Sequence, residues 1–112
     1  SIKVTAMDLA QIALVFANGG IEPKTNNRLF DKKYSQYINA VLMTCGMYDG
    51  SGEFALNVGV PAKSGVGGGI MAVVPNRMGI GIFSPALDKK GNSIAGIKAL
   101  ELLSKNLELS IF

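Results

Sequence analysis

Residues that could perform acyl-transfer chemistry lie close together in the middle of the chain. Tyr48 offers a phenol hydroxyl, Lys63 a cation and Ser64 a second hydroxyl, and residues 65–69 read Gly-Val-Gly-Gly-Gly. Because glycines carry no side chain, the backbone N–H groups of residues 65–69 can approach another molecule closely. A cation beside the phenol would favour its phenolate, and backbone N–H groups can stabilise an oxyanion. The sequence therefore predicts a candidate acyl-transfer site that includes Tyr48 and Lys63.

The length and composition limit the kind of protein that can carry this site. The chain has 112 residues, at most one domain, with 48% hydrophobic and 17% charged residues. So few charged residues are unusual for a soluble surface. This composition favours a fragment whose faces are covered by further protein, and a compact glycine-rich core would have the same composition. We also expect Ser1, which is not an initiator methionine and begins no signal-peptide pattern, to be a boundary inside a longer protein.

Several classes of function do not fit the composition. The net charge of +3 comes from scattered lysines and arginines, with no basic stripe interleaved with aromatic residues, so we predict no nucleic-acid partner. The absence of histidine and the single Cys45 exclude metal sites built on imidazole or thiolate. No apolar run is long enough to span a membrane. The lone cysteine fits a reducing compartment, and we predict a cytoplasmic protein.

Three helices are indicated by their capping residues and by apolar residues at helical spacing. Thr5 with an acidic residue three positions later resembles a capping box, and Asp31 is an N-cap candidate. Gly46 ends the second helix just before Tyr48, and Asn92 or Ser93 caps the last one. We expect helices over residues 5–18, about 31–45 and about 93–105.

The strands are predicted between glycine-rich and proline-containing turns. Asp-Gly and Ser-Gly steps over residues 49–52 predict one turn, and residues 75–78 predict a hairpin turn. Glycines at positions 79 and 81 leave one sheet face bare, and we expect the last helix to pack there. Residues 21–31 are predicted to be a loop. Residues 108–112 fit either an extension of the last helix or a short strand. We expect strands over residues 53–58, 63–74 and 79–83.

The fold class that follows is α+β, with an antiparallel sheet of about three strands packed with helices. Four segments have a distinctive sequence: residues 45–49 (Cys-Gly-Met-Tyr-Asp), 51–55 (Ser-Gly-Glu-Phe-Ala), 61–69 (Pro-Ala-Lys-Ser-Gly-Val-Gly-Gly-Gly) and 91–93 (Gly-Asn-Ser). They resemble the serine-dependent glutaminases, whose fold is similar to that of β-lactamases and penicillin-binding proteins. The resemblance runs from about Thr5 to Leu103 and implies that residues 1–112 are a C-terminal segment of the family's catalytic domain. The family's Ser-x-x-Lys nucleophile motif lies upstream, and these residues contain none.

The resemblance implies a role for each candidate site residue. Tyr48 relays protons between the nucleophilic serine and the leaving ammonia. Lys63, Ser64 and Gly65 resemble the Lys-Ser/Thr-Gly triplet on the strand that edges the site in β-lactamase-like enzymes, where they shape and charge the substrate pocket. The residue at the Val66 position binds substrate through its backbone amide, which contributes to the oxyanion hole.

Other chemical interpretations of the same residues are weaker. Lys63 and Ser64 are adjacent, so on a strand they point to opposite faces and do not form a Ser–Lys dyad. The glycine run precedes a strand rather than a helix N-terminus, which argues against phosphate binding. Cys45 has no histidine base available, and a buried helical cysteine is the simpler interpretation.

The function implied by the resemblance is the hydrolysis of L-glutamine to L-glutamate and ammonia through a serine acyl-enzyme. No cofactor is implied, and the partners are L-glutamine, the upstream half of the catalytic domain and further copies in a homo-oligomer, dimer or tetramer. We predict that the 112-residue chain alone is inactive. The alternative is a non-catalytic structural or interaction domain that keeps this scaffold without the chemistry.

Overall fold

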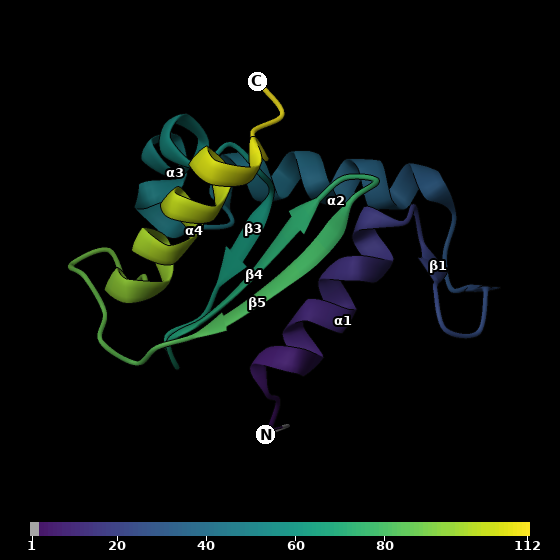
Figure 1. Ribbon diagram of the computed structural model, residues 1–112, viewed down its shortest axis with the longest axis horizontal. Helices are drawn as coiled ribbons and strands as arrows, with labels where there is room; N and C mark the ends of the chain where they lie inside the picture. The colour runs from purple at the N-terminus through teal and green to yellow at the C-terminus, as the bar shows by residue number, and fades with distance from the viewer. Residues whose placement is uncertain (1–2) are drawn as a thin grey trace.

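Three antiparallel strands form the sheet on which the rest of the chain packs (Figure 1). The structure is a computed structural model that describes residues 3–112. The predicted α+β class is confirmed, with the sheet strands in the order β3-β4-β5. The elements in chain order are α1 (Ala6–Ala17), β1 (Ile21–Glu22), β2 (Asn27–Arg28), α2 (Lys32–Cys45), the 3-10 turn η1 (Tyr48–Gly50), α3 (Ser51–Asn57), β3 (Ala62–Ser64), β4 (Gly69–Val74), β5 (Met78–Phe83) and α4 (Ile94–Leu107).

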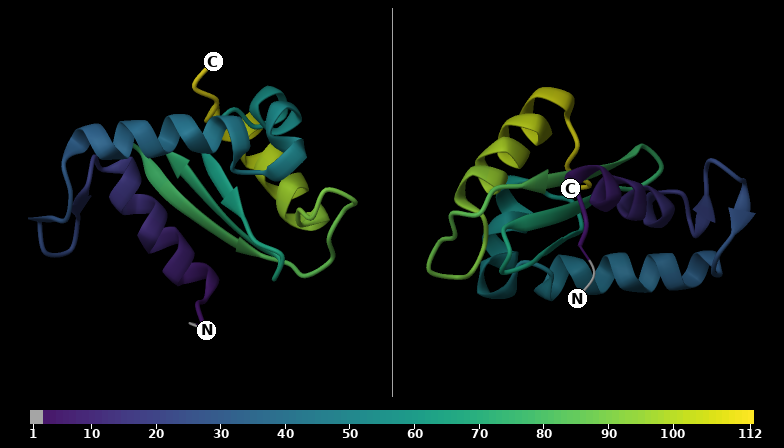
Figure 2. Two further views of the ribbon diagram at one scale, coloured as in Figure 1. Left: turned by 180° about the vertical axis from the view of Figure 1, so that it is seen from behind. Right: turned by 90° about the horizontal axis from the view of Figure 1, so that it is seen from below.

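The two faces of the sheet bury different helices, because side chains alternate along each strand. Ile70, Ala72 and Val74 of β4 face a core cluster that includes Leu100 of α4. Val73 belongs to a second cluster with alanines of α1. Figures 1 and 2 show α1 and α4 on opposite sides of the sheet. The register pairs Lys63 with Met71 and Met71 with Gly81, so Lys63 lies in a row on the α1 face.

The bare glycine face of β5 is covered by α1, which corrects the expectation that the last helix packs there. A Cβ atom on Gly81 would lie 2.0 Å from the Ala6 carbonyl oxygen, and one on Gly79 would lie 2.3 Å from that of Ala10. Both distances are far inside van der Waals contact, so helix and strand backbones meet directly at these positions. Met78, Ile80 and Ile82 of β5 project to the opposite face, where α4 packs.

The predicted helix ends are confirmed by side-chain caps. The Asp8 N–H donates to Thr5 Oγ1 (3.1 Å) and the Thr5 N–H to Asp8 Oδ2 (2.8 Å), which completes the capping box of α1. Asp31 caps α2 by accepting from the Lys33 N–H. Ser93, one of the two candidates, caps α4.

The strand predicted over residues 53–58 is wrong, because this stretch forms the short helix α3. Phe54 and Val58 are four residues apart and both are buried in the core. In a strand, residues 54, 56 and 58 would share one face, but Leu56 is 84% exposed. Burial of the first and last without the middle residue fits one side of a helix. Exposed Glu53 and Asn57 cover the outer side.

The single strand predicted over residues 63–74 is also wrong, because a tight turn divides it into β3 and β4. The Gly68 N–H donates to the Gly65 carbonyl oxygen (3.0 Å), and the Gly65 N–H to that of Gly69 (3.0 Å). Gly68 has a φ of 96°, and a Cβ there would lie 2.5 Å from the Ser84 carbonyl oxygen. Glycine therefore allows both the turn and the close approach of the segment after β5. The hairpin turn predicted over residues 75–78 is confirmed between β4 and β5.

The two irregular segments have simple structures. Within residues 21–31, β1 and β2 form a minimal hairpin. There the Glu22 carboxylate accepts hydrogen bonds from the hydroxyl and N–H of Thr25, which lower its pKa. At the other end, Glu108 at φ 54° ends α4, and the Ile111 N–H donates to the Gly59 carbonyl oxygen. Residues 108–112 thus form neither of the two alternatives that the sequence allowed.

The described helices are short. None of those within residues 3–112 is long and apolar enough to cross a membrane.

Candidate functional site

Tyr48 lies just after α2, in a backbone conformation that is unfavourable for a large side chain. Its φ is 53°, in the left-handed region. This backbone conformation costs about 1–3 kcal/mol for a residue such as tyrosine, and it persists only where the surrounding structure imposes it. The Met47 N–H donates to Ser51 Oγ (3.0 Å), and Ser51 Oγ donates to the Tyr48 carbonyl oxygen (2.8 Å). Ser51 therefore holds the backbone on both sides of the tyrosine. Such outliers often mark functional positions.

Gly46 brings the end of α2 against the edge strand β3. The Ser64 N–H donates to the Gly46 carbonyl oxygen (3.0 Å). A Cβ on Gly46 would lie 1.9 Å from the Ala62 carbonyl oxygen, so only glycine permits this approach. The contact places the residues that follow α2, including Tyr48, beside β3.

Lys63 and Tyr48 meet across this junction. The Lys63 ammonium nitrogen lies over the Tyr48 ring, 4.4 Å from the ring centroid, and its other contact is the Ser64 carbonyl oxygen. This is a cation–π arrangement, with the charge on the ring face. Tyr48 is 41% exposed and Lys63 is also exposed, so both groups remain accessible to a substrate.

The turn after β3 presents Val66 outward. Its side chain is 75% exposed, and Gly65 and Gly67 have no neighbour within 4 Å of a Cβ position. Val66 is the second residue of the turn closed by Gly68 and Gly65. Within residues 3–112, no hydrogen bond uses the Val66 N–H. The turn therefore offers a backbone donor on an open side of the molecule.

A groove of about 320 Å³ lies on the α1 face of the sheet, beside the candidate site. Lys63 connects the two, because it lines the groove and also contacts Tyr48, which is not part of the lining. The groove is lined by Val4, Leu9, Lys63, Ser64, Gly65, Gly67, Gly69, Met71 and Phe83.

The Ser64 hydroxyl points away from Lys63, as expected for neighbours on a strand. The residue is 3% exposed, and its Oγ donates to Asn92 Oδ1 at 2.5 Å. The Asn92 amide nitrogen in turn donates to the Met47 carbonyl oxygen (2.8 Å). The sequence pattern indicated Asn92 only as a possible helix cap. The one further indication of a functional role was its position in residues 91–93, one of the four segments of the family resemblance. Its contacts join Met47 to Ser64.

Cys45 does not fit the interpretation of a buried helical cysteine, because its thiol is exposed at the end of α2. Within residues 3–112, no group of three or more histidine, cysteine, aspartate or glutamate side chains could hold a metal ion.

Comparison with known proteins agrees with this geometry. A family model described as Glutaminase matches residues 1–112. The chain belongs to the glutaminase family. The glutaminase of Clostridium tetani is 60% identical over 112 residues, and that of Alkaliphilus oremlandii is 59% identical. Each match covers 100% of this chain and 37% of the relative.

Solved glutaminase structures share the fold. A Bacillus glutaminase crystallised in the presence of 4.3 M NaCl matches with a TM-score of 0.94 and 45% identity, over 97% of this chain and 38% of that one. The covalent complex between a Bacillus subtilis glutaminase and 5-oxo-L-norleucine matches with a TM-score of 0.94 and 44% identity, over 97% and 40%. The family resemblance predicted from the sequence is therefore confirmed. This glutaminase chain spans about 37% of the length of the curated relatives.

Proposed function

We propose that this chain is part of an enzyme that hydrolyses the side-chain amide of L-glutamine to L-glutamate and ammonia. The observation that carries the proposal is the Lys63 ammonium group over the ring of a strained Tyr48, in a chain of the glutaminase family. Strain at a functional residue is retained only where the surrounding structure imposes it, as Ser51 does here.

The proposed reaction has two steps. In the first, a serine outside this chain attacks the amide carbon, and Tyr48 relays the serine hydroxyl proton to the nitrogen as the C–N bond breaks and ammonia leaves. In the second, water attacks the ester carbon of the acyl-enzyme, and Tyr48 relays a water proton to the serine oxygen as the ester C–O bond breaks, so glutamate is released and the serine is restored. The serine nucleophile comes from the family resemblance, and Tyr48 is the proton relay that this chain contributes.

The other candidate residues support that chemistry by charge and hydrogen bonding. Lys63 places a positive charge beside the relay, where negative charge develops. The N–H of Val66, which makes no hydrogen bond within residues 3–112, stabilises the oxyanion of the tetrahedral intermediate or binds substrate, and Gly65 keeps the approach to it open. Ser64 acts from the protein interior, by fixing β3 through Asn92.

A relative supplies chemical support. The Bacillus subtilis glutaminase forms its complex with 5-oxo-L-norleucine by reaction with 6-diazo-5-oxo-L-norleucine. 5-Oxo-L-norleucine has a ketone at the position of the side-chain amide carbon of glutamine. The covalent product keeps this ketone, so the enzyme's nucleophile has bonded to the neighbouring carbon, and the diazo group has left as N₂. Such a product fits an enzyme whose own nucleophile lies beside the amide position of glutamine.

The remaining part of the catalytic site is proposed to dock partly on α2. Tyr34, Tyr37, Ile38 and Val41 form an apolar stripe along α2, and all four are exposed, Tyr37 to 62%. An apolar helix face of this kind is normally covered. Since the relatives are far longer than this chain, we assign the stripe to the upstream part of the same polypeptide. The chain alone is then expected to be inactive.

The test is ammonia release from L-glutamine. The assay compares residues 1–112 alone, the same chain mixed with the separately expressed remainder of the Clostridium tetani glutaminase, and a hybrid glutaminase in which residues 1–112 replace the matched segment of that enzyme. We expect activity in the hybrid and the mixture but none in the chain alone. Tyr48→Phe in the hybrid should lower kcat by about 10²–10⁴-fold. Ser104→Ala, which also removes one hydroxyl, should leave kcat within about threefold.

The other outcomes are informative. Turnover by the isolated chain would mean that Tyr48, Lys63 and Ser64 form a complete site, and the assignment of an external serine would be wrong. A hybrid that folds but releases no ammonia from L-glutamine would contradict the proposed activity. That result would favour the alternative, a structural or interaction domain that keeps the scaffold.

Two further properties belong to the same proposal. We infer a cytoplasmic location, which is supported by the exposed, unpaired thiol of Cys45. We also infer a homo-oligomer, a dimer or tetramer, from the family resemblance. Light scattering of the hybrid at micromolar concentration tests the second point, and the mass of a single protomer would contradict it.

A further inference from the structure

Asn92 links the two segments that carry the proposed site. It is 1% exposed, and each end of its amide has one partner. Its nitrogen donates to the carbonyl oxygen of Met47, the residue before Tyr48, at 2.8 Å. Its oxygen accepts from the hydroxyl of Ser64, the residue after Lys63, at 2.5 Å. The Tyr48 backbone and the Lys63 strand are therefore joined through one side chain.

The orientation of this amide follows from its partners. The Met47 carbonyl oxygen can only accept, so the amide nitrogen must face it. The amide oxygen then faces Ser64 Oγ, which donates. A flipped amide would place two oxygens against each other at Met47, so the observed orientation is the one that satisfies both contacts. Removal of the amide oxygen leaves the buried Ser64 hydroxyl unpaired, whereas the Met47 carbonyl oxygen keeps a hydrogen bond from the Gly50 N–H (3.1 Å).

The loop that holds Asn92 also touches Tyr48 directly. The Asn92 N–H donates to Asp88 Oδ1 (3.0 Å), and the Asp88 N–H donates to the Asn92 carbonyl oxygen (2.8 Å). These two bonds fix the backbone from which the amide projects. A Cβ on neighbouring Gly91 would lie 3.8 Å from two carbons of the Tyr48 ring, so this loop supports one side of the ring.

We propose that Asn92 is a positioning residue that holds Tyr48 against Lys63. The inference rests on the proposed glutaminase activity for its kinetic consequences. Tyr48 has a positive φ that needs external support. Ser51 bonds to the peptide groups before and after it, and Asn92 adds a link from the Met47 carbonyl oxygen to β3. Without the Asn92 contact, the ring loses one of the links that fix it relative to the lysine, and the contacts of Gly46 and Ser51 remain. Displacements of about 1 Å can cost a hundredfold in rate.

The kinetic test uses the hybrid glutaminase. Asn92→Ala should lower kcat by about 10- to 100-fold with a smaller change in KM, because it disturbs the proton relay more than substrate binding. In a Tyr48→Phe background the same substitution should cost less than about threefold, since its effect passes through the lost hydroxyl. Equal losses in both backgrounds would overturn the proposal. Ser64→Ala, which removes only one of the two links, should give a smaller loss and provides a second variant if Asn92→Ala does not fold.

An NMR experiment tests the position of Lys63 over the Tyr48 ring independently of enzyme activity. Because the Lys63 ammonium group lies over the Tyr48 ring, its Hε protons should show an upfield ring-current shift in lysine-labelled NMR spectra, assigned with Lys63→Arg. Asn92→Ala or Ser64→Ala should reduce this shift. Ser104→Ala, which removes a buried hydroxyl that donates to Val58 instead, should retain it. An unchanged shift in Asn92→Ala would overturn the positioning role even if the hybrid proved inactive. A lost shift in an inactive hybrid would support positioning and contradict the proposed function alone.

Discussion

The ammonium nitrogen of Lys63 lies 4.4 Å from the centroid of the Tyr48 ring, although one residue belongs to an edge strand and the other follows a helix. Three contacts bring these two side chains together. Gly46 lets the end of α2 touch β3, Ser51 holds the Tyr48 backbone, and Asn92 ties the two segments together. The arrangement places a cation and a phenol in the same region as an exposed turn, in which the Val66 N–H makes no hydrogen bond within residues 3–112. The predictions below test its separate parts.

Removal of the Lys63 charge should reduce activity with little effect on folding. Lys63→Met keeps the aliphatic stem and removes the cation, so it should lower kcat/KM of the hybrid by about 10- to 100-fold, and Lys63→Arg should lower it less. The lysine is exposed, so the free energy of unfolding should change by less than about 1 kcal/mol. Ammonia release and urea unfolding measure the two quantities.

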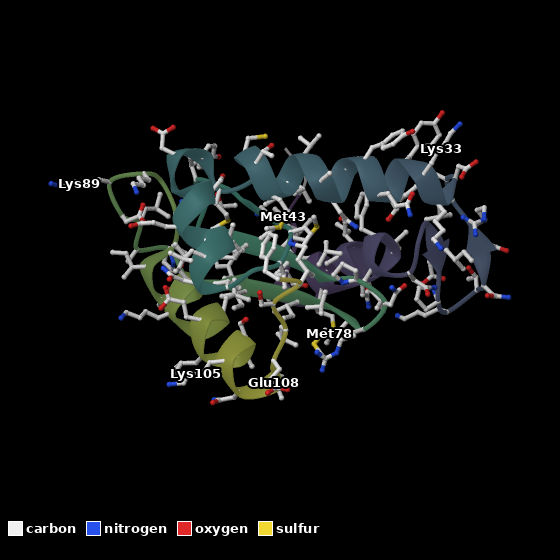
Figure 3. The ribbon with its side chains drawn as sticks, turned by 90° about the horizontal axis from the view of Figure 1, so that it is seen from above. Lys33, Met43, Met78, Lys89, Lys105 and Glu108 are labelled. Atoms are coloured by element: carbon white, nitrogen blue, oxygen red, sulfur yellow. The ribbon has the colours of Figure 1, made fainter. Side chains whose placement is uncertain are left out.

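The matched control is Lys89→Met, which makes the same change at an exposed lysine. Figure 3 shows Lys89 at the outer tip of the loop before α4, directed away from the molecule. Its activity should match that of the hybrid without substitutions. Equal losses for the two variants would show that net charge, rather than the Lys63–Tyr48 contact, governs the rate.

Two substitutions at Val66 distinguish a role of its backbone N–H from a role of its side chain. Val66 is the second residue of the turn from Gly65 to Gly68, and Gly67 does not have a positive φ, which is typical of a type I turn. Proline is favoured at this position, so Val66→Pro should fold while it removes the N–H. We expect kcat to fall by about 10²–10³-fold if that N–H stabilises the oxyanion.

The comparison is Val66→Ala, which shortens the side chain and keeps the N–H. Its kcat should stay within about threefold of the unsubstituted hybrid. Full activity of a folded Val66→Pro variant would exclude the backbone donor. A large loss in Val66→Ala would instead assign the role to the side chain.

The features that local sequence determines were predicted correctly. Thr5, Asp31 and Ser93 cap their own helices, so their signals do not depend on distant residues. The helix α3 was missed because a short apolar run fits a strand as well as a helix. Phe54 and Val58 would share a face in either structure, and only the exposure of Leu56 between them decides for the helix.

The site was predictable only in part, for the same reason. The family resemblance indicated Tyr48 and Lys63, but spacing along the chain does not bring them together. The contact depends on Asn92, which lies 28 residues after Ser64 and 45 after Met47. Local patterns carry no signal for such a link, and Asn92 also fits a simple helix cap.

Gly81 tests the close packing of α1 on β5. The Cβ of Gly81→Ala would lie 2.0 Å from the Ala6 carbonyl oxygen, a backbone atom that cannot move alone. We expect a loss of about 3 kcal/mol in the free energy of unfolding of the hybrid, measured with urea and circular dichroism. Gly52→Ala is the control, because nothing lies within 4 Å of its Cβ and it is in α3. It should stabilise by about 0.5 kcal/mol, and a comparable loss in both variants would contradict the packing described here.

The apolar stripe of α2 should matter for association and not for the fold of the chain. Val41 is 56% exposed, so Val41→Glu should leave the circular dichroism of residues 1–112 unchanged. A charge buried against an apolar partner is costly, so the same variant should bind the remainder of the Clostridium tetani glutaminase at least about tenfold more weakly in calorimetry. Ala95→Glu adds the same charge to an exposed position of α4 and should bind normally. If Val41→Glu also bound normally, the stripe would need another occupant, because an apolar partner cannot accept a buried carboxylate without loss of affinity.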